Sequence, residues 1–226
     1  MAVAEWTGAS VDWQAEFEAL KALKARIAPA LGRAETRISA GAFIDGLLGP
    51  AERRTGWMLA ERAGMERPHR IQSLLGRGTR SAEALRDRMR DYVMQALGDE
   101  DGVLVVDETG FLKKETHSVG VARQYSSTAG RVDNCQIGVF AAYASRWGQA
   151  LVDRRLYLPR AWAEDGARRA KASVPEETTF ATKPAIAGAM LGELLDAGLP
   201  VRWVLADALY GSDFRLRRML EERGQP

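Results

Sequence analysis

The first hundred residues carry apolar side chains at steps of three and four, which is the period of an α-helix. A first helix is predicted to begin at Ser10 or Asp12, either of which can cap it, and to end or kink at Pro29. Its apolar positions are Trp13, Phe17, Leu20, Leu23, Ile27 and Leu31. Residues 10–98 are therefore predicted to be entirely helical, with further helices over 39–48, 52–63, 68–76 and from Ser81 to the terminating Gly98.

The pattern changes after Gly98 to short apolar runs bounded by polar turns, which is typical of buried strands. The run 103–106 leads directly into Asp107. The stretches 119–125 and 136–143 are predicted to form a three-stranded meander with it, joined by a turn over 129–134. Residues 151–157 alternate and predict a further strand, and 159–172 predict a polar helix or loop carrying a basic run.

A second strand of the same design, 201–206, ends at Asp207 and follows a predicted helix over 184–197. Another helix is predicted from Ser212. The fold class is thus α+β or α/β. We expect a helical amino-terminal domain, residues 1–98, followed by an incomplete ribonuclease H-like domain, residues 99–226. In that architecture the strand before Asp207 lies parallel to the first strand, which brings Asp107 and Asp207 to one edge of the sheet.

Composition indicates an ordinary soluble protein. The chain has 226 residues, of which 46% are hydrophobic and 27% charged, with a net charge of +2. The single cysteine, Cys135, excludes an internal disulfide, and with two histidines it makes a structural zinc site an unfavourable interpretation. The absence of a signal peptide or a long apolar run predicts a cytoplasmic protein with no membrane segment.

The positive charge is concentrated in one helical segment. Residues 52–90 contain ten arginines and five acidic residues, a net charge of +5. One interpretation is a surface that binds DNA phosphates, with Arg77, Arg80 and Arg86 as the candidate contacts. The other is a solvated helical surface in an arginine-rich protein, and the sequence does not decide between them.

Two carboxylates at one sheet edge repel each other unless a proton or cation lies between them. Oxygen ligands of this kind suit Mg²⁺ or Mn²⁺, and two such ions about 3.5–4 Å apart support phosphodiester chemistry. The alternative is that Asp107 and Asp207 only cap turns. Glu108 is a rival for Asp107, but adjacent strand residues point to opposite faces, so only one can join the site.

Three further charged residues lie near the predicted strands. Asp133 is interpreted as a turn residue at the end of the sheet opposite Asp107. Lys113 and Lys114 follow the first acid and are candidates for a DNA phosphate contact, or for a solvated loop.

Several motifs together resemble DDE-type bacterial transposases, and most closely the insertion-sequence 701 family. They are Asp107-Glu-Thr-Gly with the residues up to Tyr125, Val132–Gln136, Arg155–Pro159, Arg168–Lys171 and Leu205–Gly211. The resemblance covers most of residues 40–226. It implies a helical DNA-binding region, a ribonuclease H-like catalytic domain, Mg²⁺ or Mn²⁺, and cutting and joining of transposon ends, with a homo-oligomer as a compatible assembly. It gives Asp107 and Asp207 the places of the first two catalytic acids.

The chain departs from this family in two ways. Glu108 stands where the family's usual wording has a second aspartate. The third acid is expected beyond residue 226, so we expect this chain alone to be catalytically incomplete. The alternatives are a DNA-binding remnant that regulates transposition and a ribonuclease H-like nuclease.

Overall fold

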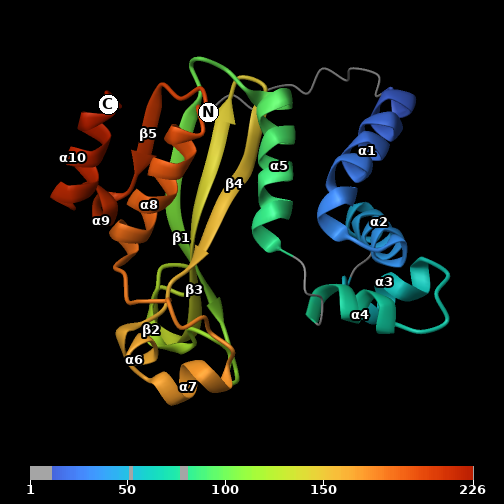
Figure 1. Cartoon of the computed structure of the whole chain (residues 1–226), viewed down its shortest axis with the longest axis horizontal. Helices are drawn as coiled ribbons and strands as arrows, with labels where there is room; N and C mark the ends of the chain where they lie inside the picture. Colours follow the sequence, from blue (N-terminus) through green and yellow to red (C-terminus); the bar gives the residue numbers. More distant parts are fainter. Residues whose placement is uncertain (1–11, 51–52, 77–80, 226) are drawn as a thin grey trace. The chain divides into compact units, whose positions relative to one another are not determined.

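The structure is a computed structural model that describes residues 12–50, 53–76 and 81–225. The chain divides into two compact units, the first up to Met89 and the second from Arg90. Their boundary falls within helix α5, Ala82–Leu97. Figure 1 labels the elements of both units, which are described separately.

The described part of the first unit is helical, as predicted. It contains α1 (Trp13–Ile27), the 3₁₀ helix η1 (Ala28–Leu31), α2 (Ala34–Leu48), α3 (Gly56–Arg62), α4 (His69–Gly76) and the first half of α5. Asp12 caps α1 by accepting hydrogen bonds from the backbone N–H groups of Gln14 and Ala15. Pro29 lies in η1, where the α-helical bonding ends.

Helix boundaries differ from the prediction in two places. Helix α2 begins at Ala34, five residues before the predicted start. Helix α3 begins at Gly56, because the Thr55 hydroxyl accepts from the N–H of Met58 and so caps the helix there. The described residues of this unit form two small apolar clusters, one of Ile27, Leu31 and Ala40 and one of Leu59, Ala60 and Ile71.

The second unit is built on a five-stranded mixed sheet with the order β2-β3-β1-β5, in which β4 also pairs with β3. The strands are β1 (Val103–Leu112), β2 (Ala122–Ser126), β3 (Arg131–Ser145), β4 (Gly148–Leu156) and β5 (Trp203–Ala206). The helices that follow or connect them are α6 (Arg160–Ala163), α7 (Gly166–Lys171), α8 (Lys183–Asp196), α9 (Ala208–Gly211) and α10 (Phe214–Glu222). None of the described helices is both long and apolar enough to cross a membrane.

The prediction that the stretches 103–106, 119–125 and 136–143 form a three-stranded meander was wrong. The antiparallel neighbour of β1 is β3, and β2 pairs with the first residues of β3 on the side away from β1. Strand β4, which the alternation at 151–157 predicted, pairs with the rest of that side of β3. The sheet's main meander is therefore β1, β3 and β4, because β3 is long enough to bind β2 at one end and β4 at the other.

Two polar residues lie in strands and not at the predicted turns. Strand β1 continues through Asp107 to Leu112, because β3 pairs with it along its whole length. Asp133, interpreted as a turn residue, lies in β3 opposite Gln124. The parallel pairing of β1 with β5 was predicted and is confirmed.

One face of the sheet forms the core of this unit. Leu104 and Val106 of β1 and Tyr143 of β3 point to this face, where they pack with Met190 and Leu191 of α8. Helix α8 lies over this face in Figure 1. Burial of these side chains fixes which residues of β1 point inward, since neighbouring strand residues alternate between faces.

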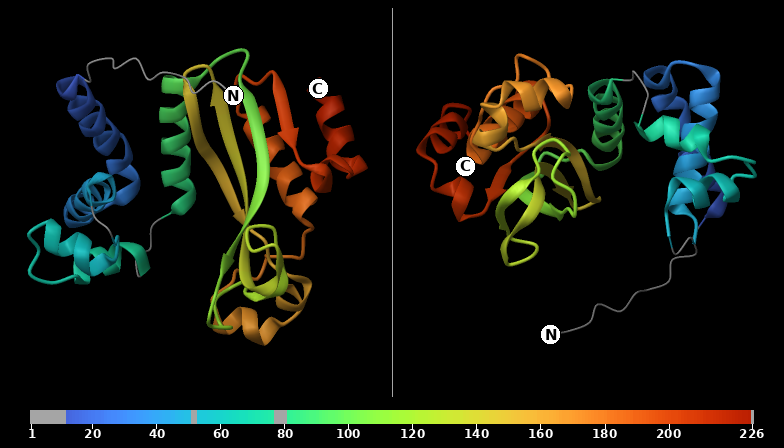
Figure 2. Two further views of the ribbon diagram at one scale, coloured as in Figure 1. Left: turned by 180° about the vertical axis from the view of Figure 1, so that it is seen from behind. Right: turned by 90° about the horizontal axis from the view of Figure 1, so that it is seen from below.

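The opposite face of the sheet carries exposed apolar side chains. Trp203, Leu205 and Leu151 are 46%, 54% and 65% exposed. Seen from behind in Figure 2, no helix of the second unit's described residues lies in front of β1 and β3. Among those residues β5 pairs only with β1, so its other side is a sheet edge.

Candidate active site

The two aspartates singled out by the sequence follow the last paired residues of the parallel strands. Val106 of β1 pairs with Ala206 of β5. Asp107 is the next residue after Val106, and Asp207 is the next residue after Ala206. Residues in register on parallel strands point to the same face. Asp207 keeps an extended backbone, with φ −74° and ψ −179°, so the alternation of β5 continues to it.

Each aspartate is exposed and uses one carboxylate oxygen for a local hydrogen bond. Asp107 Oδ1 accepts from the backbone N–H of Glu108 at 2.7 Å. Asp207 Oδ1 accepts from the N–H groups of Leu209 and Tyr210 at 2.8 and 3.3 Å, and so caps α9. Asp207 thus does cap a turn, as the alternative interpretation required, whereas Asp107 lies inside a strand and does not.

Glu108 points to the opposite, buried face of β1. Its Oε1 accepts from Lys183 Nζ of α8 at 2.7 Å, and its Oε2 accepts from the Tyr210 hydroxyl of α9 at 2.5 Å. Its side chain is 12% exposed and that of Lys183 is 19% exposed. The expectation that only one of Asp107 and Glu108 faces the site agrees with this geometry, since the two lie on opposite faces.

Tyr210 is hydrogen-bonded to Glu108 through its hydroxyl and to Asp207 through its backbone N–H. Its side chain is fully buried. Burial, above all, raises the pKa of the Tyr210 hydroxyl far above its ordinary value, and the hydrogen bond to Glu108 and the negative charges of Glu108, Asp107 and Asp207 raise this pKa further. The hydroxyl therefore remains a hydrogen-bond donor across the physiological pH range.

The two aspartates have the chemistry of a divalent-cation site. Within the described residues, the hydrogen bonds of both acids involve only Oδ1, so Oδ2 of each exposed acid is placed to coordinate a cation or to accept a hydrogen bond from water. Hard ions such as Mg²⁺ and Mn²⁺ prefer such oxygens and keep several waters, so a pair of exposed carboxylates fits them. No group of three or more His, Cys, Asp or Glu suited to one metal ion occurs in the ranges that the structure describes.

The two candidate lysines are not beside these acids. Because β1 continues to Leu112, Lys113 is six residues beyond Asp107, or about 20 Å along the strand at about 3.3 Å per residue. Lys113 and Lys114 begin the loop that leads to Thr116, whose carbonyl accepts from Arg168 of α7 at 2.7 Å. A DNA contact by these lysines would lie away from the carboxylates.

The structure describes only one of the three candidate arginines of the first unit. Arg77 and Arg80 lie outside the described residues. Arg86 is partly buried and bonds to Asp87, with its Nη2 2.9 Å from Oδ1. Several other arginines of the basic segment are exposed, namely Arg53, Arg54, Arg62, Arg67, Arg70 and Arg88. The positive surface of this unit is therefore broader than the three residues that the sequence suggested.

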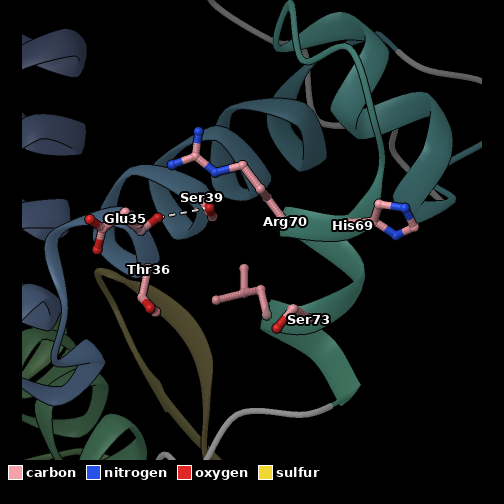
Figure 3. Close-up of a pocket in the computed structure, with 7 residues that line it drawn as sticks. Glu35, Thr36, Ser39, His69, Arg70 and Ser73 are labelled. Atoms are coloured by element: carbon pink, nitrogen blue, oxygen red, sulfur yellow. Dashed lines mark hydrogen bonds between the residues drawn. The ribbon is translucent and has the colours of Figure 1, made fainter.

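One polar hollow of about 240 Å³ lies between α2 and α4. Figure 3 shows Arg70 extending from α4 toward α2, where the Ser39 hydroxyl donates to the Glu35 carbonyl at 2.8 Å. The hydroxyl groups of Thr36 and Ser73 also line the hollow. These groups suit a phosphate oxygen, but the Glu35 carboxylate at the same hollow opposes an anion, so the hollow alone does not define a binding site.

Sequence reasoning missed Lys183 and Tyr210. The sequence indicated only that Asp107 and Glu108 point to opposite faces of the strand, and a carboxylate that is mostly buried requires a partner. No local pattern shows which residue supplies that partner. Tyr210 lies within a motif that was recognised, but only its aspartate was given a role.

The helices followed by a mixed sheet, with one acid after the last paired residue of each of two parallel strands, are compatible with a ribonuclease H-like fold. The family model described as DDE superfamily endonuclease matches residues 26–226, and the chain belongs to this family. The chain is also 27% identical over 168 residues to a Microchaete diplosiphon protein described as a probable transposase for insertion sequence element IS701. That alignment covers 74% of this chain and 41% of the relative, so the chain spans less than half of the relative's length. The resemblance stated from the motifs is thereby confirmed.

Proposed function

We propose that this chain carries the DNA-binding region and the first two catalytic carboxylates, Asp107 and Asp207, of a transposase that cuts and joins the ends of an insertion sequence. The observation that carries the proposal is the register of β1 with β5, which puts the two acids one residue beyond the paired positions Val106 and Ala206. The family to which the chain belongs and the transposase relative support the same activity.

Mg²⁺ or Mn²⁺ bound by such a carboxylate pair would activate an attacking oxygen and stabilise a leaving one in phosphodiester chemistry. The chain's own contribution is to hold the two aspartates in place. Asp107 is held by the strand ladder of β1 and by the N–H of Glu108, and Asp207 by the first N–H groups of α9. The exposed position of both acids leaves room for a DNA phosphate.

The helical unit is proposed to bind DNA through phosphates. The +5 charge of residues 52–90 and the exposed arginines on α3 and α4, such as Arg62 and Arg70, support this role. Lys113 and Lys114 are proposed as a separate phosphate contact of the second unit. Homo-oligomerisation is compatible with the exposed apolar face of the sheet, since such faces are commonly covered by a partner.

The described residues supply two acids to the site and no third. Glu221 and Glu222 are at the far end of α10, and Glu222 is paired with Arg218 at 2.9 Å. We therefore propose that the 226-residue chain binds DNA without cutting it. A DNA-binding regulator of transposition is the alternative that this feature favours.

The test compares three nucleic acids with the purified full chain: duplex DNA bearing the element's ends, a duplex of shuffled sequence, and an RNA–DNA hybrid. Binding is measured by gel shift and cleavage is followed with Mn²⁺. The proposal predicts preferential binding of the ends and no cleavage of the hybrid. Hybrid cleavage that is lost in Asp107→Ala would indicate a ribonuclease, and equal binding of all three would contradict a transposase.

A further inference from the structure

Three polar side chains behind the aspartates form one connected network, in which Tyr210 is buried and Glu108 and Lys183 are partly buried. Glu108 of β1 accepts from Lys183 Nζ at 2.7 Å and from the Tyr210 hydroxyl at 2.5 Å, so both of its oxygens are occupied. Lys183 is the first residue of α8, which Thr182 caps, and its ammonium also lies 5.8 Å from the centre of the Tyr157 ring. The network joins β1, α8 and α9.

This network is connected to both aspartates through the backbone. The N–H of Glu108 donates to Asp107 Oδ1 at 2.7 Å. The N–H of Tyr210 donates to Asp207 Oδ1 at 3.3 Å, while the hydroxyl of the same residue binds Glu108. Tyr210 is therefore a direct bridge between the strand end that carries Asp207 and the residue next to Asp107.

Such a bridge has a mechanical consequence because the pairing of β1 with β5 ends at Val106 and Ala206. Strand β5 is only four residues long, and Asp207 lies beyond its last ladder position. Beyond that point, the Tyr210 side chain of the short helix α9 ties the segment that carries Asp207 to β1.

We propose that Tyr210, supported by Glu108 and Lys183, is a positioning residue that fixes the separation of the Asp107 and Asp207 carboxylates. This inference rests on the proposed function, in which the two acids share a divalent cation. Tyr210 would touch neither the cation nor DNA. It acts through hydrogen bonds to the groups that carry the acids, and outer partners of this kind commonly change metal affinity by about 10–100-fold.

A purely structural role for Tyr210 is distinguished by a matched residue. Tyr143 is also fully buried on the core face, and its hydroxyl oxygen lies 2.9 Å from the carbonyl oxygens of both Asp99 and Pro200, either of which can accept its one proton. Tyr143 pairs with Leu104, which is three residues before Asp107. It lies on β3, which is on the side of β1 away from β5. Tyr143→Phe therefore removes a comparable buried hydrogen-bonding group without disturbing the carboxylates.

The first measurement is Mn²⁺ binding to the full chain by calorimetry. Tyr210→Phe is expected to weaken binding about tenfold, and Tyr143→Phe to leave it within about twofold even if both variants lose similar thermal stability. Lys183→Met should behave like Tyr210→Phe, whereas Lys183→Arg, which keeps the charge beside Glu108, should restore most of the affinity. If Tyr210→Phe does not fold, Glu108→Gln replaces it, because the amide keeps the shape and weakens both bonds.

The second measurement needs no metal. Amide hydrogen exchange of the N–H groups of Glu108 and Leu209 should accelerate roughly tenfold in Tyr210→Phe, the equivalent of one lost hydrogen bond. In Tyr143→Phe these two amides should change no more than the rest of the sheet.

The outcomes separate this inference from the proposed function. Unchanged exchange and unchanged Mn²⁺ affinity in Tyr210→Phe would overturn the positioning role, even where Asp107→Asn abolishes binding and so upholds the carboxylate pair. Mn²⁺ binding that is indifferent to Asp107→Asn would overturn the shared cation, and the exchange of Glu108 and Leu209 would still decide whether Tyr210 holds the two strand ends together.

Discussion

Val106 of β1 and Ala206 of β5 are the last paired residues of two parallel strands whose partner residues lie 100 positions apart in the chain. Asp107 and Asp207 follow them, just beyond the end of the β1–β5 ladder and on the same face of the sheet. At a strand spacing of about 4.8 Å, we expect their carboxylates to lie about 4–8 Å apart. A crystal structure with bound Mn²⁺ would measure this separation, and carboxylates too far apart to share an ion would contradict the site.

Tyr143 predicts a loss of stability at alkaline pH. Burial, together with the charge of Asp99, raises the pKa of the Tyr143 hydroxyl above its ordinary value of about 10. Its contribution to the free energy of unfolding is thus complete below pH 10 and is lost as the pH rises above it. Urea unfolding at pH 8, 10 and 11 should show this loss, and Tyr143→Phe should reduce it. An equal loss in the wild type and in Tyr143→Phe would contradict the assignment.

The buried pair of Asp153 and Arg90 predicts a large effect on stability. The Asp153 side chain is fully buried, and its Oδ2 lies 3.3 Å from Nη2 of Arg90. Removing one partner of a buried pair commonly costs about 3–5 kcal/mol, so Asp153→Ala should lower the free energy of unfolding by that amount. Asp101→Ala, which removes the exposed partner of Arg202, should cost less than about 1 kcal/mol. Chemical unfolding measures both, and similar losses in the two variants would contradict the argument.

The basic segment predicts salt-dependent DNA binding. Each phosphate neutralised contributes about −0.9 to the slope of log K against log salt concentration. Replacing Arg77, Arg80 and Arg86 by alanine should flatten the slope by up to about 2.7 if all three contact phosphates. Fluorescence anisotropy with the full chain at several salt concentrations measures this slope.

The matched control removes three arginines outside the segment, Arg202, Arg215 and Arg218. It lowers the net charge equally and should leave the slope nearly unchanged. Equal slopes in the two triple variants would mean that the arginines of residues 52–90 form only a solvated surface.

The two described carboxylates predict that this chain does not cut DNA. Incubation of the purified chain with transposon-end DNA and Mn²⁺ should give no nicked product. Specific nicking that disappears in Asp107→Ala would show that a third acid is supplied from within residues 1–226, contrary to our proposal.

Much of the fold was predictable because its signals are local. The helices of the first unit follow from apolar periodicity and caps such as Asp12, although the Thr55 cap that begins α3 was missed. The parallel placement of β1 and β5 followed from the order of strands and helices. The pairing partner of β1 was predicted wrongly, because any of several short apolar stretches could pair with β1. In the structure, β3 is long enough to pair with β1 on one side and with both β2 and β4 on the other.

At the site, the sequence identified the acids but not what holds them. Asp107 and Asp207 were recognisable because each follows an apolar strand. The contacts of Glu108 with Lys183 and Tyr210 join residues 75 and 102 positions apart. No local pattern encodes such contacts, since they depend on where α8 and α9 pack against the sheet.

The most direct test of the account is Mn²⁺ binding to the metal-free full chain by calorimetry, compared among wild type, Asp107→Asn, Asp207→Asn and Asp133→Asn. The account predicts that the wild type and Asp133→Asn bind Mn²⁺ alike, because Asp133 lies near the start of β3, away from the pair. It predicts that Asp107→Asn and Asp207→Asn each lose this binding. Wild-type affinity retained in either of these two variants would contradict a shared carboxylate site.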